Sequence, residues 1–116
     1  MPITVVSTRG INDQKVIRRT GVVHNDETII NVNPTDIVSV TAELTAGPGS
    51  VLILATNAKD SGRTDFTGMA DAGGGAKTAS CASVSIGKGW TAVGVDINAS
   101  SGGTWTITYR VVPDRA

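Results

Sequence analysis

The chain has 116 residues, of which 40% are hydrophobic and 17% are charged, and its 10 basic and 10 acidic side chains give a formal net charge of zero. This length supports one domain with one core, and the composition is too apolar for a disordered chain and too poor in charge for a coiled coil. Nucleic-acid binders usually carry an excess of Lys and Arg, because phosphate contacts supply most of their affinity, so the zero net charge argues against that class.

Cysteine and leader signals bear on where the protein is made. The single cysteine, Cys81, excludes an internal disulfide, whereas a small secreted domain more often carries several cysteines. The residues that follow Met1 lack the basic and apolar regions of a signal peptide, and no apolar run approaches the roughly 20 residues of a membrane helix. We therefore expect cytoplasmic synthesis and no membrane partner, with Cys81 as a small buried apolar group.

The first half of the chain predicts β-strands separated by polar turns. β-branched residues dominate residues 3–8 and 15–24, and Gly21 interrupts the second run, where it predicts a bulge or a break. A third short strand is expected over residues 28–32. Apolar and polar residues then alternate over residues 38–44, and a period of two is typical of a half-buried strand.

The second half begins with an apolar run at residues 51–55, which predicts a strand covered on both faces. Residues 57–80 follow as a long polar loop rich in Gly and Ala, with room for one helical turn, and a loop of this length is usually functional or disordered. Further strands are expected over residues 84–86, 90–97 and 104–112. The last strand is the clearest, since every second residue from Trp105 to Val111 is apolar.

Seven or eight short strands with Gly, Pro and Asn turns predict an all-β fold, either an antiparallel β-sandwich of jelly-roll or immunoglobulin-like type or a small barrel. The domain spans residues 1–116. Within it, residues 1–19 could serve as an N-terminal arm that adds a strand to a neighbour.

The stretch DAGGGAKTAS, residues 71–80, shares letters with a phosphate-binding loop. Asp71 and Ala76 stand where the motif G-x-x-x-x-G-K-[ST] requires glycine, and a strand rather than a helix is expected to follow. We interpret the stretch as a flexible glycine-rich loop and expect no nucleotide. Asp60 and Asp65 precede it without the spacing of a calcium loop, and Arg63 lies between them, so no metal is expected.

His24 is the only histidine, and Asp26 and Glu27 follow it closely. Histidine-based catalysis would need this residue, but a zinc site would need further ligands and no G-x-S-x-G nucleophile elbow occurs in the sequence. We expect a surface histidine that ends a strand, no catalytic residue and no cofactor.

Aromatic residues are few: Phe66, Trp90, Trp105 and Tyr109. Trp105 and Tyr109 share one strand face and are expected in the core, and a core position is favoured for Trp90 too. Phe66 lies alone in the polar loop, where an exposed ring would serve as an anchor in a partner's pocket.

The residues expected to contact a partner lie in the long loop and in the N-terminal segment: Phe66, Arg63, Asp65, Met69, Arg9 and Arg18. Arg18 and Arg19 are adjacent in a predicted strand, so their side chains point to opposite faces and cannot form one basic patch. A rim salt bridge or an edge charge that blocks aggregation is the simpler interpretation of this pair.

We predict a non-enzymatic structural or interaction protein that forms a dimer or trimer and binds a larger protein scaffold. Zero net charge removes the repulsion that keeps molecules apart. In its general character, helix-free and poor in cysteine, the chain is similar to the accessory proteins that decorate or cement bacteriophage capsids, although no motif carries this analogy. The resemblance implies a place on the virion surface, where the protein clamps neighbouring capsid subunits.

The alternative from a different class is a carbohydrate-binding module or a lectin-like β-sandwich. Its candidate contacts are Trp90, Asp60, Asp65 and Asn57, and the scarcity of aromatic residues weighs against it.

Overall fold

The computed structural model describes residues 3–7, for which it gives the backbone alone, and residues 15–26, 28–58, 66–78, 80–99 and 102–113. Nine strands occur within these ranges, and none of the ranges contains a helix. The strands are β1 (Ile3–Ser7), β2 (Lys15–Val22), β3 (Ile30–Asn31), β4 (Asp36–Ala46), β5 (Val51–Thr56), β6 (Ala70–Asp71), β7 (Cys81–Gly87), β8 (Ala92–Ile97) and β9 (Thr104–Pro113). Accordingly, these ranges include no helix that is long and apolar enough to cross a membrane.

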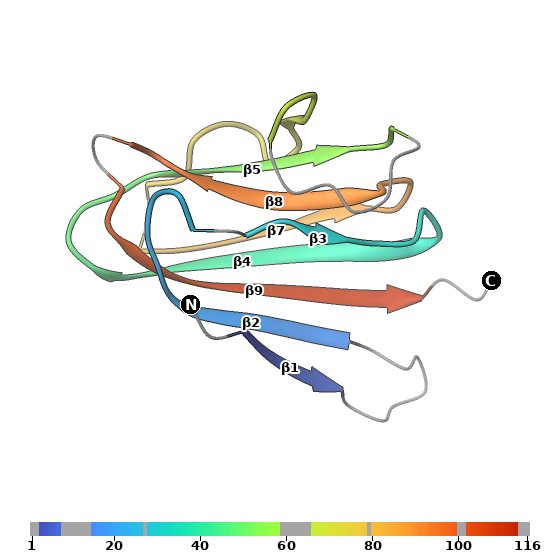
Figure 1. Ribbon diagram of the computed structural model, residues 1–116, viewed down its shortest axis with the longest axis horizontal. Helices are drawn as coiled ribbons and strands as arrows, with labels where there is room; N and C mark the ends of the chain where they lie inside the picture. Colours follow the sequence, from blue (N-terminus) through green and yellow to red (C-terminus); the bar gives the residue numbers. More distant parts are fainter. Residues whose placement is uncertain are drawn as a thin grey trace.

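Two antiparallel sheets pack against each other, so the predicted all-β sandwich is confirmed (Figure 1). The larger sheet has the order β1-β2-β9-β4-β7, and the smaller sheet has the order β3-β8-β5-β6. The long strands β4 and β9 are neighbours in the middle of the larger sheet, with Val40 opposite Tyr109. The predicted irregularity at Gly21 is also confirmed, because the β2–β9 register shifts between Arg19 and Val22 and Gly21 has a φ of 65°.

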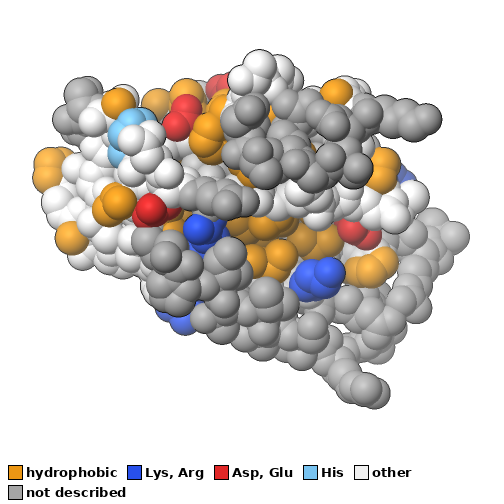
Figure 2. Space-filling model, in the orientation of Figure 1, with side chains coloured by type: hydrophobic (Ala, Val, Ile, Leu, Met, Phe, Trp, Pro, Cys, Tyr) orange, Lys and Arg blue, Asp and Glu red, His pale blue; other side chains and the backbone are white. Residues whose placement is uncertain are grey.

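The core lies between the sheets and is built from the apolar positions of alternating strands. Its buried cluster comprises Val22, Val38, Val40, Ala42, Val51, Ile53, Ala55, Val93, Val95, Ile97, Trp105, Ile107 and Tyr109. Full burial of an aliphatic or aromatic side chain of this size stabilises a fold by about 1.5–3 kcal/mol. Figure 2 shows hydrophobic side chains at the surface in the hollow between the two layers, with basic side chains beside them.

A buried polar chain fixes one point of contact between the sheets. The Tyr109 hydroxyl on β9 donates a hydrogen bond to the Thr28 carbonyl. The Thr28 hydroxyl in turn donates to the Val95 carbonyl at 2.6 Å and accepts from the Val95 amide at 3.1 Å. Thr28 therefore continues the pairing of β3 with β8 through its side chain. Burial raises the pKa of Tyr109 well above its ordinary value of 10.0, against the opposing effects of the Thr28 hydrogen bond and the Arg19 charge.

The segment from 57 to 80 differs from the loop that the sequence predicts. Ala70–Asp71 forms β6 at the edge of the smaller sheet, where Asp71 lies opposite Leu54. Lys77 then makes an isolated bridge to Val51, with backbone bonds of 2.8 and 3.1 Å. Residues 66–78 contain no helical turn, and residues 59–65 lie outside the described ranges. The third strand is also shorter than expected, since only Ile30 and Asn31 pair with β8.

Candidate functional site

The residues predicted to contact a partner are placed only in part. Arg9, Arg63 and Asp65 lie outside the described residues. Arg18 is exposed on β2, whereas Phe66 and Met69 are half-buried in a turn closed by the bond from the Met69 amide to the Phe66 carbonyl at 3.0 Å. Their role as partner contacts stays a prediction.

Phe66 is half-buried rather than the fully exposed anchor that the sequence suggested. Its ring packs over β8 at Gly94, where an added Cβ would lie 2.8 Å from Phe66 Cε1 and 2.8 Å from Ile29 Cγ1. Side chains essentially never approach that closely, so the ring needs a glycine beneath it. The sequence could not reveal this contact, because Gly94 and Phe66 are distant along the chain.

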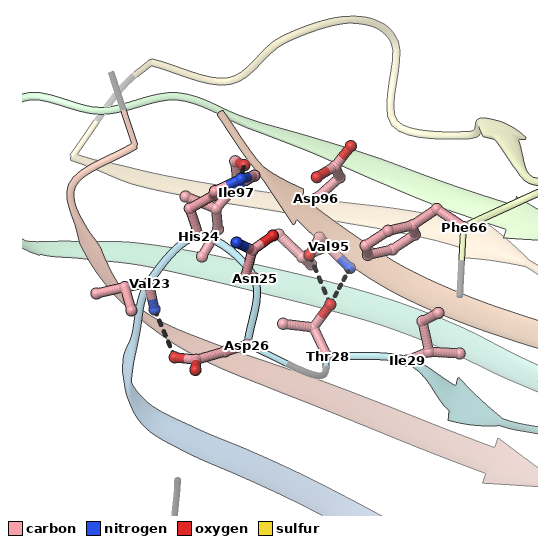
Figure 3. Close-up of a pocket in the computed structure, with 10 residues that line it drawn as sticks. All are labelled: Val23, His24, Asn25, Asp26, Thr28, Ile29, Phe66, Val95, Asp96 and Ile97. Carbon is pink, nitrogen blue, oxygen red and sulfur yellow. Dashed lines mark hydrogen bonds between the residues drawn. The ribbon is translucent and has the colours of Figure 1, made fainter. Parts of the chain in front are cut away.

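Phe66 forms one end of a hollow with a volume of about 270 Å³ (Figure 3). The hollow is lined by Val23, His24, Asn25, Asp26, Thr28, Ile29, Phe66, Val95, Asp96 and Ile97. In Figure 3, His24 lies next to Ile97 at the opposite end from the Phe66 ring, and Asp96 lies between the two ends. An aromatic ring, a carboxylate and an imidazole thus border one depression.

The turn after β2 builds the polar end of this hollow. His24 Nδ1 lies 2.9 Å from the Ile97 carbonyl, so the ring donates a hydrogen bond there from Nδ1. Asn25 occupies the left-handed region with a φ of 73°, which Asn tolerates better than most residues. The Asp26 carboxylate accepts the Val23 amide at 2.8 Å and closes the turn.

A second hollow, of about 360 Å³, shares His24, Asp96 and Ile97 with the first. Its other lining residues are Ser50, Val51, Leu52, Ala76, Asn98 and Ala99. Because His24 and Asp96 line both hollows, we call the two hollows the His24–Asp96 groove. Its polar groups and its single aromatic ring could contact a polyhydroxylated ligand.

The described residues contain no cluster of three or more His, Cys, Asp or Glu side chains that could hold a metal ion. Asp60 and Asp65 lie outside these residues, so the expectation that the loop carboxylates bind no calcium stays a prediction. The Asp71 carboxylate accepts the amides of Gly73 at 2.9 Å and Gly75 at 2.7 Å. Two amides of the glycine-rich stretch therefore already donate hydrogen bonds to a carboxylate of the same loop.

Of the other residues singled out in the sequence, two lie where they were not expected: Cys81 and Arg19. Trp105 and Tyr109 are fully buried, as predicted, and Trp90 packs half-buried against the core with its indole donating to the Ile86 carbonyl at 2.8 Å. Cys81 was expected to be buried but is exposed, because it begins β7, the strand at one end of the larger sheet.

The position of Arg19 also differs from the prediction. It was expected at a rim or edge, but it is only 4% exposed, and among the described residues its Nε has no hydrogen-bond partner. The two arginines do point to opposite faces, since Arg18 is exposed. The burial of an arginine in a β-rich run has no local signal in the sequence, because it depends on segments that are distant along the chain.

The sequence matches no protein-family model, and no curated protein matches it.

Proposed function

We propose that the protein is a non-enzymatic assembly protein, which forms a dimer or trimer with its own kind and binds a larger protein scaffold such as a capsid. The observation that carries this proposal is the outer edge of β7 at one end of the larger sheet, which pairs with no other strand among the described residues. A sheet edge is a ready template for pairing with another chain, and natural proteins usually block such edges with charges or proline. The residues of β7, CASVSIG, include neither.

The zero net charge of the chain supports the same assembly function. Ten basic and ten acidic residues leave no net repulsion between copies, which favours association. By the analogy of general character with capsid accessory proteins, the assembled protein would sit on a virion surface after cytoplasmic synthesis and clamp neighbouring capsid subunits. The partner contacts would come from Phe66, Met69, Arg18 and the N-terminal segment.

Light scattering coupled to size exclusion, over a range of protein concentrations, tests this function. A monomer has a mass of 11.8 kDa. We expect a mass that rises with concentration toward a dimer or trimer, and then co-sedimentation of the protein with empty capsid shells. A mass that stays monomeric at every concentration would remove the basis of the proposal.

A carbohydrate-binding function is the second candidate, and the His24–Asp96 groove is the observation that favours it. Sugars are commonly held by an aromatic face together with carboxylate and amide groups. Trp90, which the sequence offered for this role, is engaged with the core, whereas Phe66, Asn25 and Asp96 border the groove.

A glycan array tests this candidate with the purified wild-type protein. Binding that Asp96→Asn abolishes and that Asn57→Ala leaves intact would support the groove, because Asn57 does not line it. Absence of binding to any glycan would exclude the candidate.

A further inference from the structure

Strand β7 differs from the other described ends of the two sheets. It pairs only with β4 and is seven residues long, whereas β1 at the other end of the larger sheet has five residues and β3 and β6 at the ends of the smaller sheet have two each. Among the described residues, no other segment bonds to its outer edge. A neutral strand of this length, without proline, has none of the usual protection against pairing.

The β4–β7 register shows which backbone groups of β7 point outward. The Leu44 amide donates to the Ser80 carbonyl at 2.8 Å, and in the same register Ala42 lies opposite Ala82 and Val40 opposite Val84. Bonded and non-bonded pairs alternate in an antiparallel ladder, so Ser80, Ala82 and Val84 direct their backbone groups to β4. The N–H and C=O groups of the residues between them therefore point away from the sheet. These outward residues are Cys81, Ser83 and Ser85.

The open part of the edge ends at Ser85. Ser39 lies opposite Ser85, but Val38 lies opposite Gly87, so Ile86 is an extra residue that breaks the ladder. The Ile86 carbonyl also accepts the Trp90 indole N–H at 2.8 Å. The regular, open stretch is thus residues 81–85, and its outward groups are arranged symmetrically about Ser83.

We propose that this edge binds the same edge of a second copy, with the two β7 strands antiparallel about a two-fold axis at Ser83. Ser83 then lies opposite Ser83 of the other copy, and Cys81 lies opposite Ser85. All outward N–H and C=O groups of residues 81–85 find partners, and the two larger sheets join into one continuous sheet. This arrangement rests on the proposed assembly function and specifies its self-contact.

Packing also favours a second copy of the chain at this edge. Val84 and Ile86 pack against the core yet stay half-buried, because they lie at the outer edge of the sandwich. Ala82 and Val84 of the second copy would continue their apolar face, since Ala82 lies opposite Val84 in this register. The outer face would carry only the small exposed side chains of Cys81, Ser83 and Ser85. No bulky or charged group on β7 opposes the contact.

Disulfide trapping tests the register directly, because opposite bonded residues in antiparallel strands lie about 5.5 Å apart at Cα, within the range for a disulfide. After mild oxidation, Ser85→Cys should give a covalent dimer through Cys81 of the other copy. The double variant Cys81→Ser/Ser83→Cys should cross-link on the two-fold axis. The matched controls are the wild type and Cys81→Ser/Ser85→Cys, in which no two cysteines face each other, and both should stay several-fold less cross-linked.

The cross-linking outcomes separate the register from the function. If light scattering finds a trimer, or finds a dimer but Cys81→Ser/Ser83→Cys does not cross-link, the assembly function stands and the two-fold β7 contact is wrong. If Cys81→Ser/Ser85→Cys cross-links as well as Ser85→Cys, the register about Ser83 is wrong. If the wild type is a monomer at every concentration, both proposals fail.

A charge placed on the axis gives an independent readout. Ser83→Lys sets two ammonium groups opposite each other, so the dimer should dissociate at concentrations where the wild type is associated. Thr20→Lys adds the same charge to an exposed position on β2 and should leave the mass unchanged. An unchanged mass for Ser83→Lys, with a melting temperature equal to that of the wild type, would overturn the contact.

Discussion

Gly94 is the residue on which the position of Phe66 depends. An added Cβ would lie 2.8 Å from both the Phe66 ring and the Ile29 side chain, so Gly94→Ala must displace one of them. Overpacking of this kind costs about 1–3 kcal/mol. We expect urea denaturation to show a loss of that size, and Gly94→Ala/Phe66→Ala to lose less than the sum of the two single changes. Additive losses would show that the two residues do not interact.

Tyr109 gives the fold a pH dependence. Burial raises its pKa above the value of 10.0 that it has in the unfolded chain, so the folded state holds the phenolic proton more tightly. The stabilising contribution is complete below pH 10 and is lost as the pH rises further, at up to about 1.4 kcal/mol per pH unit.

Tyr109→Phe should therefore flatten the alkaline decline in the free energy of unfolding, which urea titrations between pH 8 and about pH 11 would measure. At neutral pH the variant should lose about 1 kcal/mol, because the hydrogen bond to the Thr28 carbonyl is absent. An identical alkaline slope in both proteins would contradict the assignment.

At the scale of elements, Asp71 organises the segment between β6 and β7. Its carboxylate accepts the Gly73 and Gly75 amides, so Asp71→Ala should speed hydrogen exchange at these two amides and at Lys77. Asp36→Ala is a matched control, because Asp36 accepts the Asn33 amide in a different turn at 3.1 Å. Unchanged exchange at Gly73 and Gly75 in Asp71→Ala would show that the loop is held by other contacts.

The elements also show how far the sequence predicts the fold. The alternation over residues 38–44 and 104–112 predicted β4 and β9 and their buried faces, since a period of two is a local property of a strand. The pairing of Ala70–Asp71 with β5 was missed because two residues carry no periodic signal. The burial of Arg19 and the exposure of Cys81 depend on which strands lie beside or above them, and neither is encoded in neighbouring residues.

The candidate site was predicted less well than the strands. Phe66 was singled out correctly as an unusual residue in a polar loop, but its contact with Gly94 and its proximity to His24 and Asp96 arise from segments far apart in the sequence. The same holds for the open edge of β7, since a strand is at the end of a sheet only by virtue of the whole topology.

At the scale of the whole molecule, the proposed dimer joins two copies of the chain through β7. In a monomer, the outward amides of Cys81, Ser83 and Ser85 face solvent and should exchange quickly, whereas those of Ala82 and Val84 bond to β4 and should be protected.

The most direct test is residue-resolved amide hydrogen exchange at increasing protein concentration. If the dimer forms through β7, amide exchange at Cys81, Ser83 and Ser85 slows as the protein concentration rises. Exchange at Ala82 and Val84 stays slow at every concentration. If exchange at Ser83 stays fast at concentrations where light scattering detects an oligomer, the β7 contact is wrong.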